Sequence, residues 1–125
     1  MALARVTVRA TETFLFNLNE AFGFFREQDA QTAPARVARL KAGLREMVEV
    51  LAWAPGGGRP ARFLASASAQ ARIRVAALLQ AATEAGIPYL REYVIEQHIV
   101  LYAHSDAEVL LLAIRHQRQL TYVIP

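Results

Sequence analysis

Cysteine is absent from this chain of 125 residues, which excludes disulfide bonds and metal sites built on thiolates. Lysine is nearly absent, because Lys41 is the only one among 14 basic residues. Long hydrophobic runs are missing too. The longest, Val109–Ile114, has six residues, whereas a helix needs about 20 to span a bilayer. Residues 1–9 alternate and carry charges, unlike a signal peptide. We therefore expect a cytoplasmic protein without a membrane segment.

What is present fits one folded domain over residues 1–125. Hydrophobic residues make up 54% of the chain and the mean hydropathy is +0.20, so we expect a partner protein to cover part of the surface. The net charge of +3 is unevenly spread: residues 50–83 carry four arginines and no acid, whereas residues 84–108 carry one arginine and five acids. Arginine suits bidentate contacts with carboxylate or phosphate, although a GC-rich genome produces the same bias.

Two helices are predicted after a short alternating strand at residues 4–9. The first begins after Thr11 or Thr13, either of which can cap it, and ends near residues 28–29. The second begins at residues 32–34 with a proline in its first turn and ends near Trp53. The short connection predicts an antiparallel pair. The apolar stripes that define the two helices are Phe14, Leu18, Phe22 and Phe25, and Val37, Leu40, Leu44, Met47, Val48 and Leu51.

Residues 54–60 contain two prolines and three glycines, which predicts a loop without helix or strand. A third helix is predicted to follow it and to run on to residue 85. Ser66 or Ser68 is placed to cap its start. Gly86 is placed to end it, and Pro88 prevents its continuation.

Three strands are predicted from residue 89 onward, at Tyr89–Ile95, His98–His104 and Val109–Arg118, with room for a short fourth at residues 121–124. Their short connections force antiparallel neighbours. The third strand is apolar on both faces, so it should be central, with helices on one side. The predicted fold class is α+β: an N-terminal strand, an antiparallel helical hairpin with a third helix, then an antiparallel meander of three to four strands.

Familiar catalytic and cofactor motifs are not matched. The run Gly56–Arg59 lacks the Lys-Ser/Thr of a P-loop and leads into a proline instead of a helix. His98 and His104 share a predicted strand face but lie about 20 Å apart at the usual strand rise, so with His116 they do not form a metal-ligand set. No Gly-x-Ser-x-Gly elbow is present. We expect no metal and no cofactor.

Several stretches taken together resemble the RelE/ParE family of toxins from bacterial type II toxin–antitoxin pairs. They are residues 13–15 with 24–30 for the family's first helix, residues 90–95 with 99–103 for its middle strands, and residues 111–120 for its closing strand. The closing strand carries the Arg-His-x-Arg-Gln ending that is common in the family, here Arg115 to Gln119. The similarity covers nearly the whole chain, with residues 63–86 as a longer helical insert than compact members have.

The resemblance implies a small cytoplasmic toxin that arrests growth when free, is neutralised by a cognate antitoxin laid across it, and serves plasmid stabilisation. RelE-like members cut mRNA in the ribosome, whereas ParE-like members inhibit DNA gyrase without cutting it. Ile99 stands where ribonuclease members place an arginine, and the lysines of their preceding strand are missing. These departures favour gyrase binding over mRNA cleavage. A non-toxic relative that only binds its partner protein is the third alternative.

The resemblance also implies candidate site residues. Cleavage without a metal needs a base, cations at the phosphate and an acid. For a nuclease the set is His116, Arg118 and Tyr122; for binding of a target or antitoxin it is Arg91, Tyr102, Arg115, His116 and Arg118. The structural alternatives are a His116 that only pairs with a backbone carbonyl, arginines that only meet solvent, and tyrosines that only pack at the edge of the core.

Overall fold

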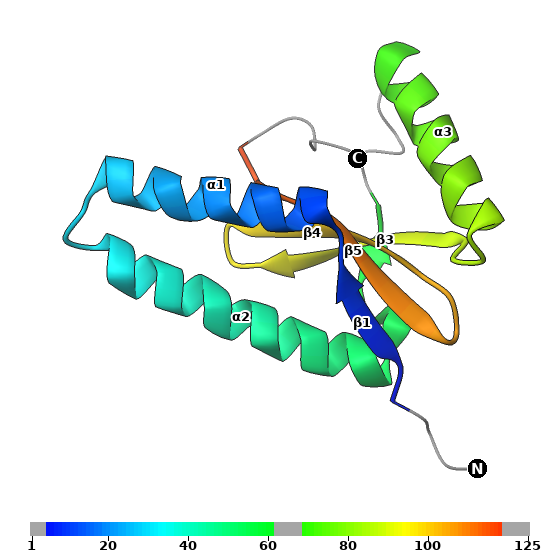
Figure 1. Ribbon diagram of the computed structural model, residues 1–125, viewed down its shortest axis with the longest axis horizontal. Helices are drawn as coiled ribbons and strands as arrows, with labels where there is room; N and C mark the ends of the chain where they lie inside the picture. The colour runs from blue at the N-terminus through cyan, green and yellow to red at the C-terminus, as the bar shows by residue number, and fades with distance from the viewer. Residues whose placement is uncertain (1–4, 62–68, 119–125) are drawn as a thin grey trace.

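The first and the last strand of the structure lie side by side in one sheet (Figure 1). In the computed structural model, which describes residues 5–61 and 69–118, β1 (Thr7–Ala10) pairs in parallel with β5 (Glu108–His116). The strand order is β1-β5-β4-β3-β2, so β5 has a neighbour on each side. The strand predicted to be central is therefore inside the sheet but next to its edge strand, and β4 is the middle strand of the order. The parallel partner of β5 is not predicted from the sequence, and it makes the five-stranded sheet of the described residues mixed.

The meander that forms the rest of the sheet is antiparallel, as predicted. Strands β3 (Tyr89–Ile95) and β4 (His98–His104) have the predicted bounds. Glu96 supports the two-residue turn between them with a positive φ of 52°. Strand β5 ends at His116, two residues before the predicted end, because the Gln117 amide turns back and donates to the Gln97 carbonyl (2.8 Å). The alternative fourth strand at residues 121–124 lies outside the described residues.

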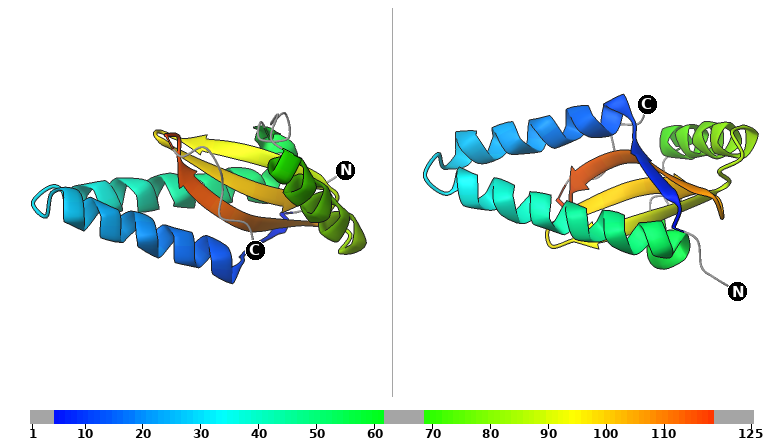
Figure 2. Two further views of the ribbon diagram at one scale, coloured as in Figure 1. Left: turned by 90° about the horizontal axis from the view of Figure 1, so that it is seen from above. Right: turned by 60° about the horizontal axis from the view of Figure 1, so that its bottom comes forward.

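Helices α1 (Glu12–Gln28) and α2 (Ala33–Trp53) form the predicted antiparallel hairpin and cover one face of the sheet (Figure 2). Thr11 caps α1, because its hydroxyl accepts the Phe14 amide (3.1 Å). The phenylalanine stripe of α1 and the stripe of α2 then meet side chains from every long strand. The members of this first core that are at most 4% exposed are Phe14, Phe25, Ala33, Leu40, Met47, Leu51, Val100, Tyr102, Val109 and Leu111.

Where the short β1 ends, polar side chains at the start of α1 and within it continue the hydrogen bonding along that edge of β5. The Thr11 hydroxyl donates to the Leu111 carbonyl (3.0 Å). Further along, the Ile114 amide donates to Asn17 Oδ1 (3.3 Å), and Asn17 is buried. A buried backbone amide without an acceptor is costly. The helix therefore takes over the role of a neighbouring strand along the second half of β5.

The opposite face of the sheet has a second core, to which α3 (Ala69–Glu84) contributes Ala82. Ile99, Leu101, Leu112 and Ala113 of β4 and β5 lie in this cluster. The predicted helix within residues 63–86 is confirmed over these bounds, and Gly86 ends it with a φ of 76°. The predicted serine caps at positions 66 and 68 lie outside the described residues.

The prediction of an unstructured loop at residues 54–60 is wrong. A 3-10 turn, η1 (Pro55–Gly57), leads into a two-residue edge strand, β2 (Arg59–Pro60), paired with β3. Proline is tolerated at a sheet edge because its missing amide faces away from the ladder. The buried Tyr102 hydroxyl holds the segment by donating to the Pro55 carbonyl (2.8 Å) and accepting the Gly58 amide (2.9 Å).

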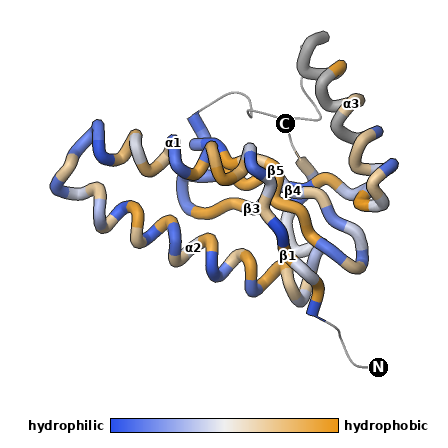
Figure 3. The backbone as a smooth tube through the Cα atoms, in the orientation of Figure 1, coloured by the Kyte–Doolittle hydropathy of each residue, from blue (hydrophilic) through white to orange (hydrophobic). Residues whose placement is uncertain are grey.

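Hydropathy follows this layering (Figure 3). Strands β4 and β5 are mostly hydrophobic along their length, whereas α1 and α2 alternate between hydrophobic and hydrophilic residues, as helices with one buried face do. In the part of the chain that the structure describes, no helix combines the length and apolarity that a bilayer crossing requires.

Two glycines give a matched test of this packing. A Cβ on Gly58 would collide with the Glu92 carbonyl and lie 2.7 Å from the Tyr102 hydroxyl, whereas a Cβ on Gly23 of α1 would meet nothing within 4 Å. We expect Gly58→Ala to lower the free energy of unfolding by about 1–3 kcal/mol through overpacking. We expect Gly23→Ala to raise it by roughly 0.5–1 kcal/mol through helix propensity. Urea unfolding measures both; a neutral Gly58→Ala would contradict the described loop position.

Candidate functional site at two ends of the sheet

The candidate residues from the sequence separate into two groups at opposite ends of β4. At the start of β4, His98 pairs in register with His116 at the end of β5. At the other end, Arg91 pairs with Tyr102, next to His104. We call Arg36, His98, His116 and Arg118 the histidine end, and Arg91, Tyr102 and His104 the arginine end. The structure therefore does not bring all the predicted residues into one site.

The histidine end is built from four elements. The ring centroids of His98 and His116 lie 5.3 Å apart with their planes at 81°. Phe25 of α1 packs edge-on against His98 at 5.8 Å, and the Arg36 guanidinium of α2 lies over the Phe25 ring at 4.2 Å. His98, Phe25 and Arg36 were not among the predicted site residues. The two-residue turn at Glu96-Gln97 is the sequence signal for the position of His98, since it places that residue at the same end as the last residues of β5.

The imidazole of His116 is held in one tautomer. Its Nδ1 accepts the backbone amide of Arg118 (3.1 Å), so the ring hydrogen is on Nε2. Nε2 points to Gln97 Oε1 at 3.4 Å. The lone pair that a general base would use is therefore already bonded to a backbone amide.

The two predicted arginines near this end, Arg115 and Arg118, have different surroundings. Arg115 alternates with His116 and lies on the opposite face of β5, where its Nη1 donates to the His116 and Gln117 carbonyls at 3.4 Å each. Arg118 is exposed. Tyr122, the third residue of the nuclease set, lies outside the described residues. His116 and Arg118 are thus adjacent, and Arg115 is turned away from them.

Both histidines of this end are biased toward the neutral form. Burial, with added repulsion from His116 and Arg36, lowers the pKa of His98 to about 4. Burial, and then the charges of Arg118 and Arg36, lower the pKa of His116. At neutral pH the charge of this end is therefore carried by its arginines.

Tyr102, at the arginine end, is a structural residue. Its side chain is fully buried, and its hydroxyl bonds Pro55 and Gly58 as described above. Burial raises the pKa of Tyr102, while the Gly58 amide and the Arg91 charge act in the opposite direction. Its hydroxyl is not presented to solvent, whereas Arg91 beside it is half-buried and donates from Nε to His104 Nε2 (3.0 Å).

A fully buried carboxylate, Glu92, lies on the other face of β3 and was not anticipated from the sequence. It pairs across the strands with Arg59 of β2, whose Nε lies 3.6 Å from Glu92 Oε1. Alternation along β3 places Glu92 on the same face as Leu90, which belongs to the second core. The two side chains form an ion pair between β2 and β3, in which Arg59 Nε makes no hydrogen bond among the described residues.

No group of three or more histidine, aspartate or glutamate side chains within residues 5–61 and 69–118 is placed to hold a metal ion.

Neither a protein-family model nor a curated protein sequence matches this chain.

The lowered pKa of His98 makes stability depend on pH. In the unfolded chain this histidine, with its usual pKa of 6.5, binds a proton below that pH, whereas the folded His98 stays neutral down to about pH 4. We expect the free energy of unfolding to fall by about 2 kcal/mol more between pH 7 and pH 5 in the native protein than in His98→Phe. Urea unfolding at both pH values measures the difference. Parallel losses in the two proteins would contradict the lowered pKa.

Proposed function

We propose that the protein is the toxin component of a type II toxin–antitoxin pair and arrests growth by binding and inhibiting DNA gyrase. The order of its elements supports the proposal: strand β1, the α1–α2 hairpin, then the meander β3-β4-β5. The resemblance of the closing strand to RelE/ParE toxins supports it from the sequence. The surface that would act is the histidine end.

One observation carries the choice of binding over cleavage: the lone pair of His116 Nδ1 is bonded to the Arg118 amide. A ribonuclease would need that ring to accept the proton of a 2′-hydroxyl group. Here the ring instead shapes the turn that presents Arg118 to solvent. Arg118 and Arg36 then provide the charge of a recognition surface for an acidic or phosphate-bearing target.

The RelE-like alternative, cleavage of mRNA in the ribosome, is favoured by a different observation. The lowered pKa of His116 keeps the ring neutral near pH 7, as a general base must be. Opening of the 3.1 Å contact to the Arg118 amide would be required first.

An antitoxin is the second partner of the proposal. Apolar side chains stand exposed on α1, with Phe16 at 59% and Phe24 at 50%. Exposed aromatic residues of this size are typical of surfaces that a partner covers. The high apolar content of the chain agrees with such a partner.

The test separates the two activities with one conservative variant. His116→Asn keeps an acceptor near the position of Nδ1, so the Arg118 amide is still bonded, but it removes the imidazole base. For a gyrase inhibitor we expect His116→Asn to inhibit supercoiling by purified gyrase within about threefold of the native protein, because the turn is retained. For a nuclease we expect a loss of about 10²–10⁴-fold. Arg118→Gln should weaken gyrase inhibition at least tenfold, and Arg45→Gln, on the exposed face of α2, is the control.

Three outcomes decide among the alternatives. Absence of supercoiling inhibition at stoichiometric excess rules out the gyrase proposal. Cuts in translated messages in a cell-free translation extract, lost in His116→Asn, establish the nuclease instead. Unimpaired growth after induction of the protein alone favours the non-toxic relative.

A further inference from the structure

A chain of hydrogen bonds at the arginine end fixes one guanidinium in place. Nδ1 of His104 lies 3.0 Å from the Ser105 carbonyl, which can only accept, so Nδ1 carries the hydrogen. Nε2 of the same ring is then the acceptor for the Nε–H of Arg91 (3.0 Å). The two contacts together require the neutral, Nδ1-protonated ring. Arg91 is therefore oriented by His104, and His104 by the backbone of Ser105.

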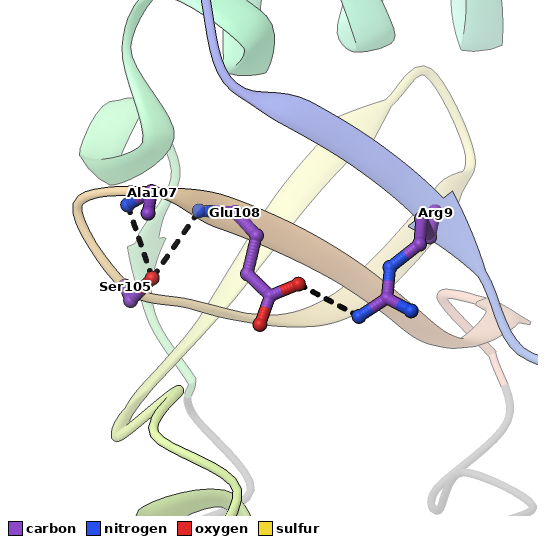
Figure 4. A network of polar contacts seen from close by, with 4 residues as sticks. All are labelled: Arg9, Ser105, Ala107 and Glu108. Carbon is purple, nitrogen blue, oxygen red and sulfur yellow. Dashed lines mark hydrogen bonds and ion pairs between the residues drawn. The ribbon is translucent and has the colours of Figure 1, made fainter.

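The turn that supplies this carbonyl is closed by side-chain hydrogen bonds (Figure 4). The Ser105 hydroxyl accepts the backbone amides of Ala107 (3.0 Å) and Glu108 (3.2 Å). The Glu108 carboxylate in turn pairs with Arg9 of β1 at 2.7 Å. The anchor of Arg91 thus extends through the β4–β5 turn to the neighbouring strand.

Two tyrosine rings pack against the His104 ring, and the 3-10 turn packs against the Arg91 guanidinium. The centroid of the His104 ring lies 5.0 Å from that of Tyr89, its cross-strand partner, and 5.9 Å from that of Tyr102 on its own strand. The guanidinium lies against the 3-10 turn, where a Cβ on Gly56 would sit 3.8 Å from Arg91 Nε. Because Nε is used by His104, the fork of two terminal nitrogens is what Arg91 offers to a ligand. Among residues 5–61 and 69–118 these two nitrogens have no hydrogen-bond or ion-pair partner.

Two exposed apolar side chains contact the residues that hold Arg91. Tyr89, which stacks on His104, is 51% exposed, and Val50 of α2 is 39% exposed. Val50 lies against the same turn, since its Cγ1 would be 3.5 Å from a Cβ on Gly57. A guanidinium fork with an exposed aromatic ring beside its histidine and an exposed aliphatic side chain on the neighbouring turn matches a carboxylate that has apolar neighbours.

We propose that Arg91, oriented by His104, binds a carboxylate of an acidic peptide segment whose apolar side chains rest on Tyr89 and Val50. A peptide fits better than a nucleic acid, because nucleic-acid binding draws on several cations along a backbone. The arginine of the adjacent strand β2, Arg59, is paired with Glu92 (3.6 Å), and the residue next to Val50, Glu49, is an exposed acid paired with Arg5 (3.0 Å). His104 is a positioning residue, and Arg91 contacts the ligand.

The test uses a blocked tetrapeptide of alternating leucine and glutamate, added to the full-length ¹⁵N-labelled protein. We expect saturable shifts of the Arg91 Nε–Hε resonance and of the Gly56 and Tyr89 backbone amides. In Arg91→Lys, which lacks the guanidinium resonance, the two amide shifts should report a Kd weakened at least tenfold, because an ammonium cannot form the two parallel bonds. The matched leucine–glutamine peptide should give no saturable shift. Arg45→Lys, an exposed arginine on α2, is the control and should bind as the native protein does.

Two substitutions test the role of His104: one removes the hydrogen-bond acceptor of Arg91 Nε and the other restores it. His104→Phe removes the partner of Arg91 Nε and should weaken the peptide at least fivefold, whereas His104→Gln supplies an amide oxygen in its place and should recover most of that loss. A purely packing role would give the opposite order, since a phenylalanine ring keeps the ring contacts with Tyr89 and Tyr102 better than glutamine does. Should His104→Phe fail to fold, the Arg91→Lys comparison still decides the proposal.

Three results would overturn the inference. The first is equal peptide binding by Arg91→Lys and the native protein, and the second is no saturable shift at Arg91 in the native protein. The third is tighter binding of a short single-stranded oligonucleotide than of the peptide at the Arg91 resonance, which would replace the peptide by a nucleic acid. Gyrase takes no part in this measurement, so its result is independent of the function proposed above.

Discussion

The structure depends on β5 being bonded along both of its edges. On one edge the antiparallel ladder to β4 runs from His98↔His116 to His104↔Val109. On the other edge β1 pairs with residues 108–111, and the side chains of Thr11 and Asn17 continue the contacts where β1 ends. Because the strand is apolar on both faces, neither edge nor face can be left to solvent without cost. The first core, the second core and the ends of the sheet all take their positions from this strand.

Buried polar groups then fix the elements that hydrophobic packing alone would leave free to slide. Tyr102 holds the 3-10 turn, Asn17 sets the position of α1 along β5, and Glu92 with Arg59 attaches the two-residue strand β2. Each of these contacts is between groups distant in sequence. Apolar burial supplies most of the stability, whereas such specific bonds select one register among several that would bury similar area.

Local sequence patterns were sufficient to predict most helices and strands, but not which of them lie next to each other. The phenylalanine spacing of α1, the proline in the first turn of α2 and the alternation of β3 and β4 each depend on neighbours within a few residues, so their bounds are predicted well. The pairing of β1 with β5 joins residues about 100 positions apart, and the two-residue strand β2 is too short to show any period. The site shows the same division. His116 and Arg118 are predicted together because they are two residues apart, whereas the approach of Arg36 and Phe25 to His98 depends on how α1 and α2 lie on the sheet.

The pairing of β1 with β5 has a consequence for synthesis. Residues 7–10 leave the ribosome well before their partners at 108–111, an interval of roughly 5–20 s at usual translation rates. The helices α1 and α2 are joined by a short connection and can pair early, but their contacts with β5, such as Asn17 with Ile114, must wait for that strand. Folding dominated by such distant contacts is slow. The histidine end, which needs His116 opposite His98, is therefore assembled only at the close of folding, and during the interval a chaperone or a partner has access to surfaces that the finished domain conceals.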